Sequence, residues 1–308
     1  MNRFERCAWA FLAYLLFVIL FGAWVRISGS GDGCGNHWPL CGGEVIPWSP
    51  STKRIIEFSH RVTSGLSGIF GLVLLVWARR ISRPVYRAAV ATVVFLLIEA
   101  FLGAVLVKKE LVAGDASASR AIMVGLHLCN TMLLTASAAA MAWRAGLSHV
   151  TNRTIAVPGA ILTGVVVLLF ATNATGAVTA LGDTLFPVQP ASGAGLYAKV
   201  RDDLSPAQHF LVRLRILHPI VAMTTVVLVG AVLVWLMQGR PFRLLKSSLH
   251  ALGGQAALGF LNIALGAPAW MQLLHLLAAQ VVWILVFLSV CALRASGNRD
   301  ASMALDSA

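Results

Sequence analysis

Long apolar runs separated by short polar segments dominate the chain. The stretch Val62–Ala78 contains no Asp, Glu, Lys or Arg, and Cys7–Val25 contains no charged residue. About 20 consecutive apolar residues are enough for a helix to cross a bilayer. The pattern therefore predicts eight transmembrane helices, over roughly 7–27, 55–78, 86–107, 120–143, 155–177, 210–237, 247–266 and 269–293.

The first apolar run could be a signal peptide or a transmembrane helix, and the last could be one long helix or two. Cys7–Val25 follows a basic start, as in a signal peptide, but it is long enough to span and no clear small-residue cleavage site follows it. We interpret it as the first helix. The run Ser247–Leu293 is too long for one span, and Gly266-Ala267-Pro268 is the natural break between two helices.

Composition and charge agree with an all-α integral membrane protein. Of the 308 residues, 58% are hydrophobic and 12% are charged, which is about half the charged fraction of a soluble domain. The net charge of +12 could suggest nucleic acid, but the basic residues lie in short clusters between apolar runs. They outnumber acids at both termini and after the second, fourth and sixth predicted helices. This bias favours cytoplasmic termini and topology signals rather than a nucleic-acid partner.

The second half of the sequence repeats features of the first half in the same order. Four matches recur at offsets of 148 to 158 residues, and such an internal repeat indicates two structural units of the same polarity. We therefore predict two tandem, pseudo-symmetric four-helix bundles, over residues 1–150 and 151–308. The matching residues are Gly22-Ala23 with Gly176-Ala177, His60 with His218, Glu99 with Gln255, and His127 with His275.

Four histidines lie at similar depth in the even-numbered predicted helices. His60, His127, His218 and His275 are each about six residues inside the outer end, or about 9 Å at 1.5 Å per residue. A single histidine inside a membrane is most often hydrogen-bonded to a neighbouring helix. Four in repeated positions favour two pairs, each of which holds a haem iron from both sides.

Charged side chains accompany these histidines. Glu57 lies three residues before His60, so the two share one face of a helix. An acid and an imidazole inside a membrane are costly unless they face protein, cofactor or water. Arginines near the histidines could pair with haem propionates, although each could instead be a residue whose charge reaches the membrane surface. These arginines are Arg26, Arg61, Arg213 and Arg215.

A glycine-rich outer loop carries Cys34 and Cys41, seven residues apart. On an oxidising side of the membrane, such a pair can close a small disulfide loop. We favour a disulfide over free thiols or a metal site, because only His37 lies nearby and no second cysteine pair exists. The spacing leaves open whether the bridge is structural or exchanges with thiols. The corresponding second loop, about Leu181–Ala207, has no cysteine.

Together these stretches resemble the haem A synthase family, in its bacterial type with a cysteine pair. The matching motifs are Gly22-Ala-Trp-Val-Arg-Ile-Ser-Gly29, the Cys34…Trp-Pro-Leu-Cys41 loop, Ile56-Glu-Phe-Ser-His-Arg61 and the histidines of the later helices. The resemblance implies oxidation of the C8 methyl group of haem O to the formyl group of haem A, for use in cytochrome oxidase. It also implies that the cysteine pair corresponds to the family's loop disulfide.

The resemblance assigns each site residue a role. His60 and His127 would flank haem O, the substrate, while His218 and His275 would hold haem b as cofactor. Glu57 would be the acid near the substrate methyl group. One departure is Pro219, which stands where the family pattern has an arginine after the histidine.

Two alternatives from other functional classes also account for the histidines: a di-haem b-type electron carrier, and a haem transporter or chaperone. Equal depth of the four histidines disfavours a carrier that must span the bilayer. Expected partners are haem O, with haem O synthase and cytochrome oxidase assembly factors as candidates. The oligomeric state stays open, a homo-oligomer being one option.

Overall fold

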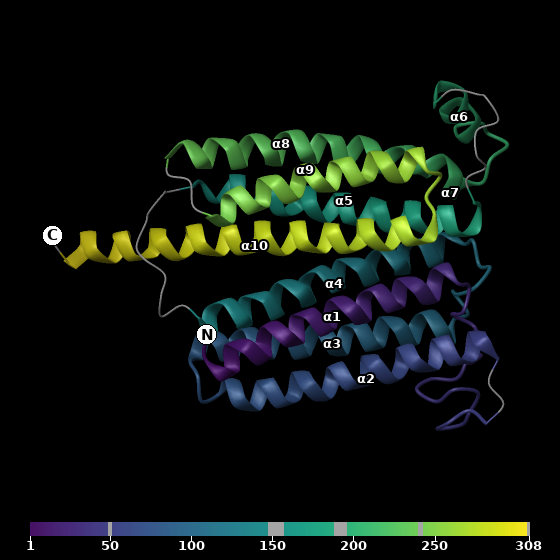
Figure 1. Ribbon diagram of the computed structural model, residues 1–308, viewed down its shortest axis with the longest axis horizontal. Coiled ribbons are helices and arrows are strands. Elements are labelled where there is room, and N and C mark those ends of the chain that lie inside the picture. The colour runs from purple at the N-terminus through teal and green to yellow at the C-terminus, as the bar shows by residue number, and fades with distance from the viewer. Residues whose placement is uncertain (49–50, 147–156, 188–195, 240–242, 307–308) are drawn as a thin grey trace.

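The computed structural model describes residues 1–48, 51–146, 157–187, 196–239 and 243–306, and within them the regular elements are helices (Figure 1). Predicted helix positions are recovered, with shifted ends. The helices are α1 (Arg3–Ile27), α2 (Thr52–Ala78), α3 (Arg83–Lys108), α4 (Ala118–Ala145), α5 (Gly159–Leu185), α6 (Leu196–Asp203), α7 (Phe210–Arg213), the 3-10 helix η2 (Leu214–Ile216), α8 (Leu217–Gly239), α9 (Arg243–Ala264) and α10 (Ala269–Asp306).

Polar caps set the true starts of the first four helices. The Asn2 side chain accepts from the Glu5 backbone N–H, and the Glu5 carboxylate accepts from the Asn2 N–H. The side chains of Ser51, Ser82 and Ser117 each accept from a backbone N–H three residues on and cap the next three helices. A cap satisfies N–H groups that lack a partner in the helix. The predicted starts at 7, 55, 86 and 120 were therefore two to four residues late, because they followed the apolar run alone.

The middle of the chain departs further from the prediction. The helix predicted to end at 177 continues as α5 to Leu185, so the second outer loop begins later than expected; residues 155 and 156 lie outside the described ranges. The predicted helix 210–237 is broken into α7, η2 and α8. Pro219 lies in the first turn of α8, where a missing N–H costs little.

The long helices form two groups (Figure 1). Helices α1 to α4 pack against their neighbours in one group, and α5, α8, α9 and α10 pack in the other. Contacts of α4 with α5 and α10, and of α1 with α10, join the groups, and buried side chains form one continuous cluster across both. The start of α1 and the end of α10 lie at one end of the bundle. The loop after α1 and helices α6 and α7 lie at the other end, which we call the outer end.

Hydrogen bonds between α4 and α10 join the two groups. The indole N–H of Trp283 on α10 donates to the carbonyl of Met132 on α4 at 2.8 Å, and both side chains are buried. One turn away, the Thr135 hydroxyl donates to Gln280 Oε1 at 3.2 Å. Such pairing is required where no water reaches the backbone.

The protein is an all-helical, multi-pass membrane protein with seven candidate membrane spans among its described residues. Six of these spans coincide with α1 to α5 and with the run Phe210–Gln238, and the seventh is Ala269–Leu293. The predicted helix 247–266 exists as α9, but its polar side chains make it less apolar than the other long helices, and it is not among the seven candidate spans. Among these side chains are Lys246, His250, Gln255 and Asn262.

Candidate functional site

A disulfide closes the outer loop between α1 and α2. Cys34 and Cys41 are bonded and both are buried, which confirms the predicted pairing. The Gly42 N–H donates to the Cys34 carbonyl at 3.0 Å and supports the ring of residues between them. At Gly33, a side-chain Cβ would lie 2.5 Å from the backbone of Lys53, so the loop packs directly on the start of α2. The glycine allows this close approach.

Glu57 on α2 holds this loop through hydrogen bonds to Cys34 and Arg61. Its side chain is buried, and Oε2 accepts from the Cys34 N–H at 2.8 Å. Oε1 accepts from Arg61 at 2.5 Å, and Arg61 also donates to the carbonyls of His37 and Leu40. We call Glu57, Arg61 and the Cys34 N–H the loop clamp. Sequence reasoning paired Glu57 with His60 and missed this loop contact, because it joins residues far apart in the chain.

The first group holds His60 and His127. The His60 ring lies against Gly22 of α1, where a Cβ would approach its Cε1 to 3.0 Å, and edge-on to Phe21. His60 Nδ1 is buried without a hydrogen-bond partner among the described residues. His127 on α4 lies with Nδ1 2.7 Å from Glu99 Oε2 of α3. Sequence reasoning singled out Glu99 but did not find this partner.

The second group holds His218 and His275 face to edge. Their ring centroids are 6.3 Å apart and their planes lie at 83°. Each ring lies against a glycine of the preceding long helix: a Cβ at Gly176 would approach His218 to 2.9 Å, and one at Gly259 would approach His275 to 3.2 Å. His275 Nδ1 is buried without a partner among the described residues. These glycines let the two rings pack directly against the helix backbone, where a larger side chain would collide with the ring.

All four histidines lie within the first ten residues of their helical runs, if α7, η2 and α8 are taken as one run. Each of these runs begins at the outer end (Figure 1). The structure therefore brings the four predicted residues to one end of the molecule, two in each helix group, and His218 and His275 are in contact.

Arg26 reaches across to the other helix group. Its guanidinium donates to the Ala180 carbonyl and the Thr184 hydroxyl of α5, and to Gln272 Oε1 of α10 at 3.3 Å. These contacts tie the end of α1 to the second group. The candidate propionate ligand is thus also a link between the two groups.

Arg215 and Arg213 differ in their surroundings. Arg215 pairs with Asp183 Oδ1 at 2.8 Å and donates to the Gly182 and Phe186 carbonyls. It fastens η2 to the end of α5. Arg213, on α7, is exposed at the same end of the molecule.

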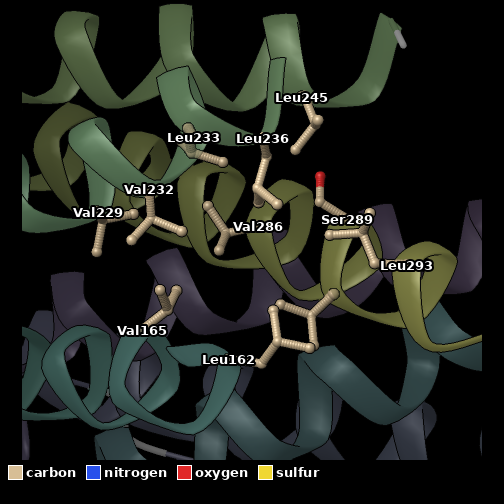
Figure 2. Close-up of a pocket in the computed structure, with 11 residues that line it drawn as sticks. Leu162, Val165, Val229, Val232, Leu233, Leu236, Leu245, Val286, Ser289 and Leu293 are labelled. Atoms are coloured by element: carbon tan, nitrogen blue, oxygen red, sulfur yellow. The ribbon is translucent and has the colours of Figure 1, made fainter. Parts of the chain in front are cut away.

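A cavity lies elsewhere, within the second group (Figure 2). It is apolar except for Ser289, and Val229 of α8 contributes to its wall. Val229 is 11 residues beyond His218, or about 16 Å along the helix. The cavity is therefore separate from both histidine pairs. Its lining residues are Leu162, Val165, Val229, Val232, Leu233, Leu236, Leu245, Val286, Ser289, Val290 and Leu293.

Comparison with known proteins identifies the family. Residues 5–287 match the model of the family COX15-CtaA, cytochrome oxidase assembly protein. The chain belongs to this family. The match extends from the start of α1 into α10, and it confirms the resemblance seen in the sequence.

Curated relatives carry two names. A Thermus thermophilus protein named protoheme IX farnesyltransferase is 43% identical over 308 residues, covering 97% of this chain and 50% of the relative. An Alkalihalophilus pseudofirmus protein named heme A synthase is 40% identical over 127 residues, or 39% of this chain and 41% of the relative. A Bacillus licheniformis heme A synthase is 41% identical over 127 residues, or 39% of this chain and 40% of the relative. The chain spans about half the length of the curated Thermus relatives.

Loss of the loop clamp should free the outer loop. In an Arg61→Gln variant, we expect hydrogen exchange at the Cys34 amide to accelerate at least roughly tenfold, because removing one partner of a buried ion pair is strongly destabilising. Exchange read by mass spectrometry on the loop peptide measures this.

The matched control is Lys53→Gln on the same helix. Lys53 pairs with Asp32 at 3.4 Å, but both side chains are about half exposed, and such pairs contribute little. Equal exchange rates in the two variants would contradict the clamp.

Proposed function

We propose that this protein is a haem A synthase that oxidises the C8 methyl group of haem O to the formyl group of haem A, for cytochrome oxidase assembly. The family match and the relatives named heme A synthase support this activity. The observation that carries it is the facing pair His218 and His275, with a second histidine pair at the same end of the molecule.

The second pair fits a haem iron. Imidazole nitrogens bind a metal at about 2 Å, so two rings on opposite sides of one iron have centroids about 6 Å apart. The observed centroids are 6.3 Å apart. His275 Nδ1 has no hydrogen-bond partner among the described residues, which also suits a metal ligand, and the glycines beside the rings fix where the rings lie. His218 and His275 would hold haem b, which supplies electron transfer when bound.

The first pair, His60 and His127, would flank haem O as the substrate. In the proposed conversion, two hydroxylations by an oxidant from outside the protein, such as dioxygen, would remove four electrons in total from the methyl group. The resulting geminal diol would then lose water to give the aldehyde. Glu57 lies one helical turn from His60, in the buried loop clamp. Its carboxylate would move a proton at the reacting carbon or stabilise positive charge that develops there. Arg61 and the Cys34 N–H would hold that carboxylate in position.

The outer arginines would guide the haem propionates. Arg213 is the first candidate, because it is exposed at the outer end. Arg26, Arg61 and Arg215 would act while also holding the protein together, since a guanidinium has five N–H donors.

A farnesyltransferase of protohaem is the partner that the relatives favour. The Thermus relative that carries that name contains a stretch 43% identical to nearly all of this chain. We propose that such a haem O synthase supplies the substrate. Cytochrome oxidase assembly factors would receive the product.

We further propose that the chain forms two tandem four-helix halves, residues 1–150 and 151–308, with α9 as an eighth membrane crossing. The packing of His60 on Gly22 and of His218 on Gly176 recurs between corresponding helices. Helix α9 packs against α8 and α10, as α3 packs against α2 and α4. With eight crossings both termini would lie on the same side, and the basic residues there favour the cytoplasmic side of a bacterial inner membrane.

Alkaline phosphatase fusions on either side of α9 test this topology. We expect a fusion after Gly239 to be inactive and a fusion after Gly266 to be active, because the enzyme folds only outside the cytoplasm. Fusions after Arg80 and Lys109, which bracket α3, serve as controls for a crossing helix. Equal activity at Gly239 and Gly266 would exclude a crossing by α9.

Extraction and identification of the pigments tests the activity. We expect purified protein to contain haem b and to convert haem O through the alcohol to haem A. In Glu57→Gln, conversion should fall by about 100-fold or more, the scale of general acid–base catalysis, while haem b is retained. His218→Ala should lose haem b, and His250→Ala, an exposed histidine on α9, should behave as the wild type.

Other outcomes identify the rival functions. An electron carrier would leave the porphyrin unchanged, and a transporter or chaperone would exchange its haem without oxidising it. Because the Thermus relatives match this chain so extensively, farnesyl transfer is a further alternative. Formation of farnesylated haem from protohaem and farnesyl diphosphate would support it.

A further inference from the structure

Two groups of α4 lie beside Glu99. Its Oε2 lies within ion-pair distance, 2.7 Å, of His127 Nδ1, and its Oε1 accepts from the Thr131 hydroxyl at 2.7 Å. Thr131 is one turn after His127, so the imidazole and the hydroxyl face Glu99 together. The Glu99 side chain is 15% exposed. The contact leaves the other ring nitrogen of His127, Nε2, available to a ligand.

The second group lacks this arrangement. Gln255 occupies the position of Glu99, and its amide nitrogen lies 3.2 Å from His275 Nε2, the opposite ring nitrogen. The residue one turn after His275 is Ala279, which has no hydroxyl. Gln255 Oε1 has no hydrogen-bond partner among the described residues. The two histidines on α4 and α10 therefore have different partners, although their helices correspond.

A carboxylate beside the ring nitrogen that does not bind the metal changes the properties of a ligating histidine. It fixes the tautomer and orientation of the ring and makes the imidazole a stronger electron donor to the metal. A stronger donor stabilises ferric over ferrous iron, so hydrogen bonding of this kind is one means by which a protein tunes haem. An amide offers no full charge for the same purpose.

We propose that Glu99, locked by Thr131, is a positioning residue that orients and polarises His127, so that the two haem sites differ in electron affinity. The inference rests on the proposed function, because it takes His127 and His275 as haem ligands. Iron at the first pair is biased toward the ferric state relative to iron at the second pair. Electron transfer from iron at the second pair to iron at the first pair is therefore less favourable than it would be if both irons had identical ligands.

Ferric haem b added to purified protein is the probe. A His275→Ala background reports the first pair, and a His127→Ala background reports the second pair. We expect Glu99→Gln to weaken haem binding at the first pair 10- to 100-fold, the usual effect of losing such a partner. It should also raise the midpoint potential and alter the electron paramagnetic resonance g values, and Glu99→Asp should restore part of each change.

The reciprocal variant guards against misfolding of Glu99→Gln. Gln255→Glu should lower the midpoint potential at the second pair, and adding Ala279→Thr should lower it further. Thr131→Ala should shift the midpoint potential at the first pair in the same direction as Glu99→Gln does, but by a smaller amount. A role limited to helix packing would leave potentials and g values unchanged.

The outcomes separate this inference from the proposed function. Unchanged potentials in both Glu99→Gln and Gln255→Glu, with haem bound at both pairs, overturn the inference alone. If the wild type binds no haem through His60 and His127, the proposed function and the inference both fail.

Discussion

The outer end of the molecule depends on one buried carboxylate. Glu57 accepts from the Cys34 backbone N–H and from Arg61, and Arg61 in turn holds the carbonyls of the loop. A charge inside an apolar bundle must find such partners, because lipid offers none. The disulfide then narrows the conformations of the same loop. As a result, the loop, the start of α2 and His60 one turn below are fixed relative to one another.

Two histidine pairs share this end of the bundle but differ in their support. In the first group, an acid stands behind His127, and a buried acid lies one turn from His60. In the second group, His218 and His275 are supported by an amide and by close glycines. Similar helix frames thus surround chemically different sites. That difference is the basis of our proposal that one site takes the substrate and the other a resident cofactor.

Much of the fold follows from local properties of the sequence. Apolar runs of membrane length predicted the positions of the long helices, and the spacing of polar residues predicted the four histidines and the cysteine pair. Helix ends were less accurate, because caps such as Asn2 and Ser51 lie outside the apolar runs. Pro219 marked an irregular point in the predicted helix 210–237, but the 3-10 segment η2 before it could not be predicted from the sequence; there Arg215 contacts the end of α5.

The sequence by itself determined which residues lie inside the membrane-spanning helices, because hydrophobicity acts through each segment independently of its neighbours. Only the tertiary structure decided their partners. Glu57 contacts the outer loop, and Arg26 reaches the other helix group. The contact of Glu99 with His127 likewise joins two helices. Such pairings depend on helix rotation and packing, which bring together residues that no local pattern connects.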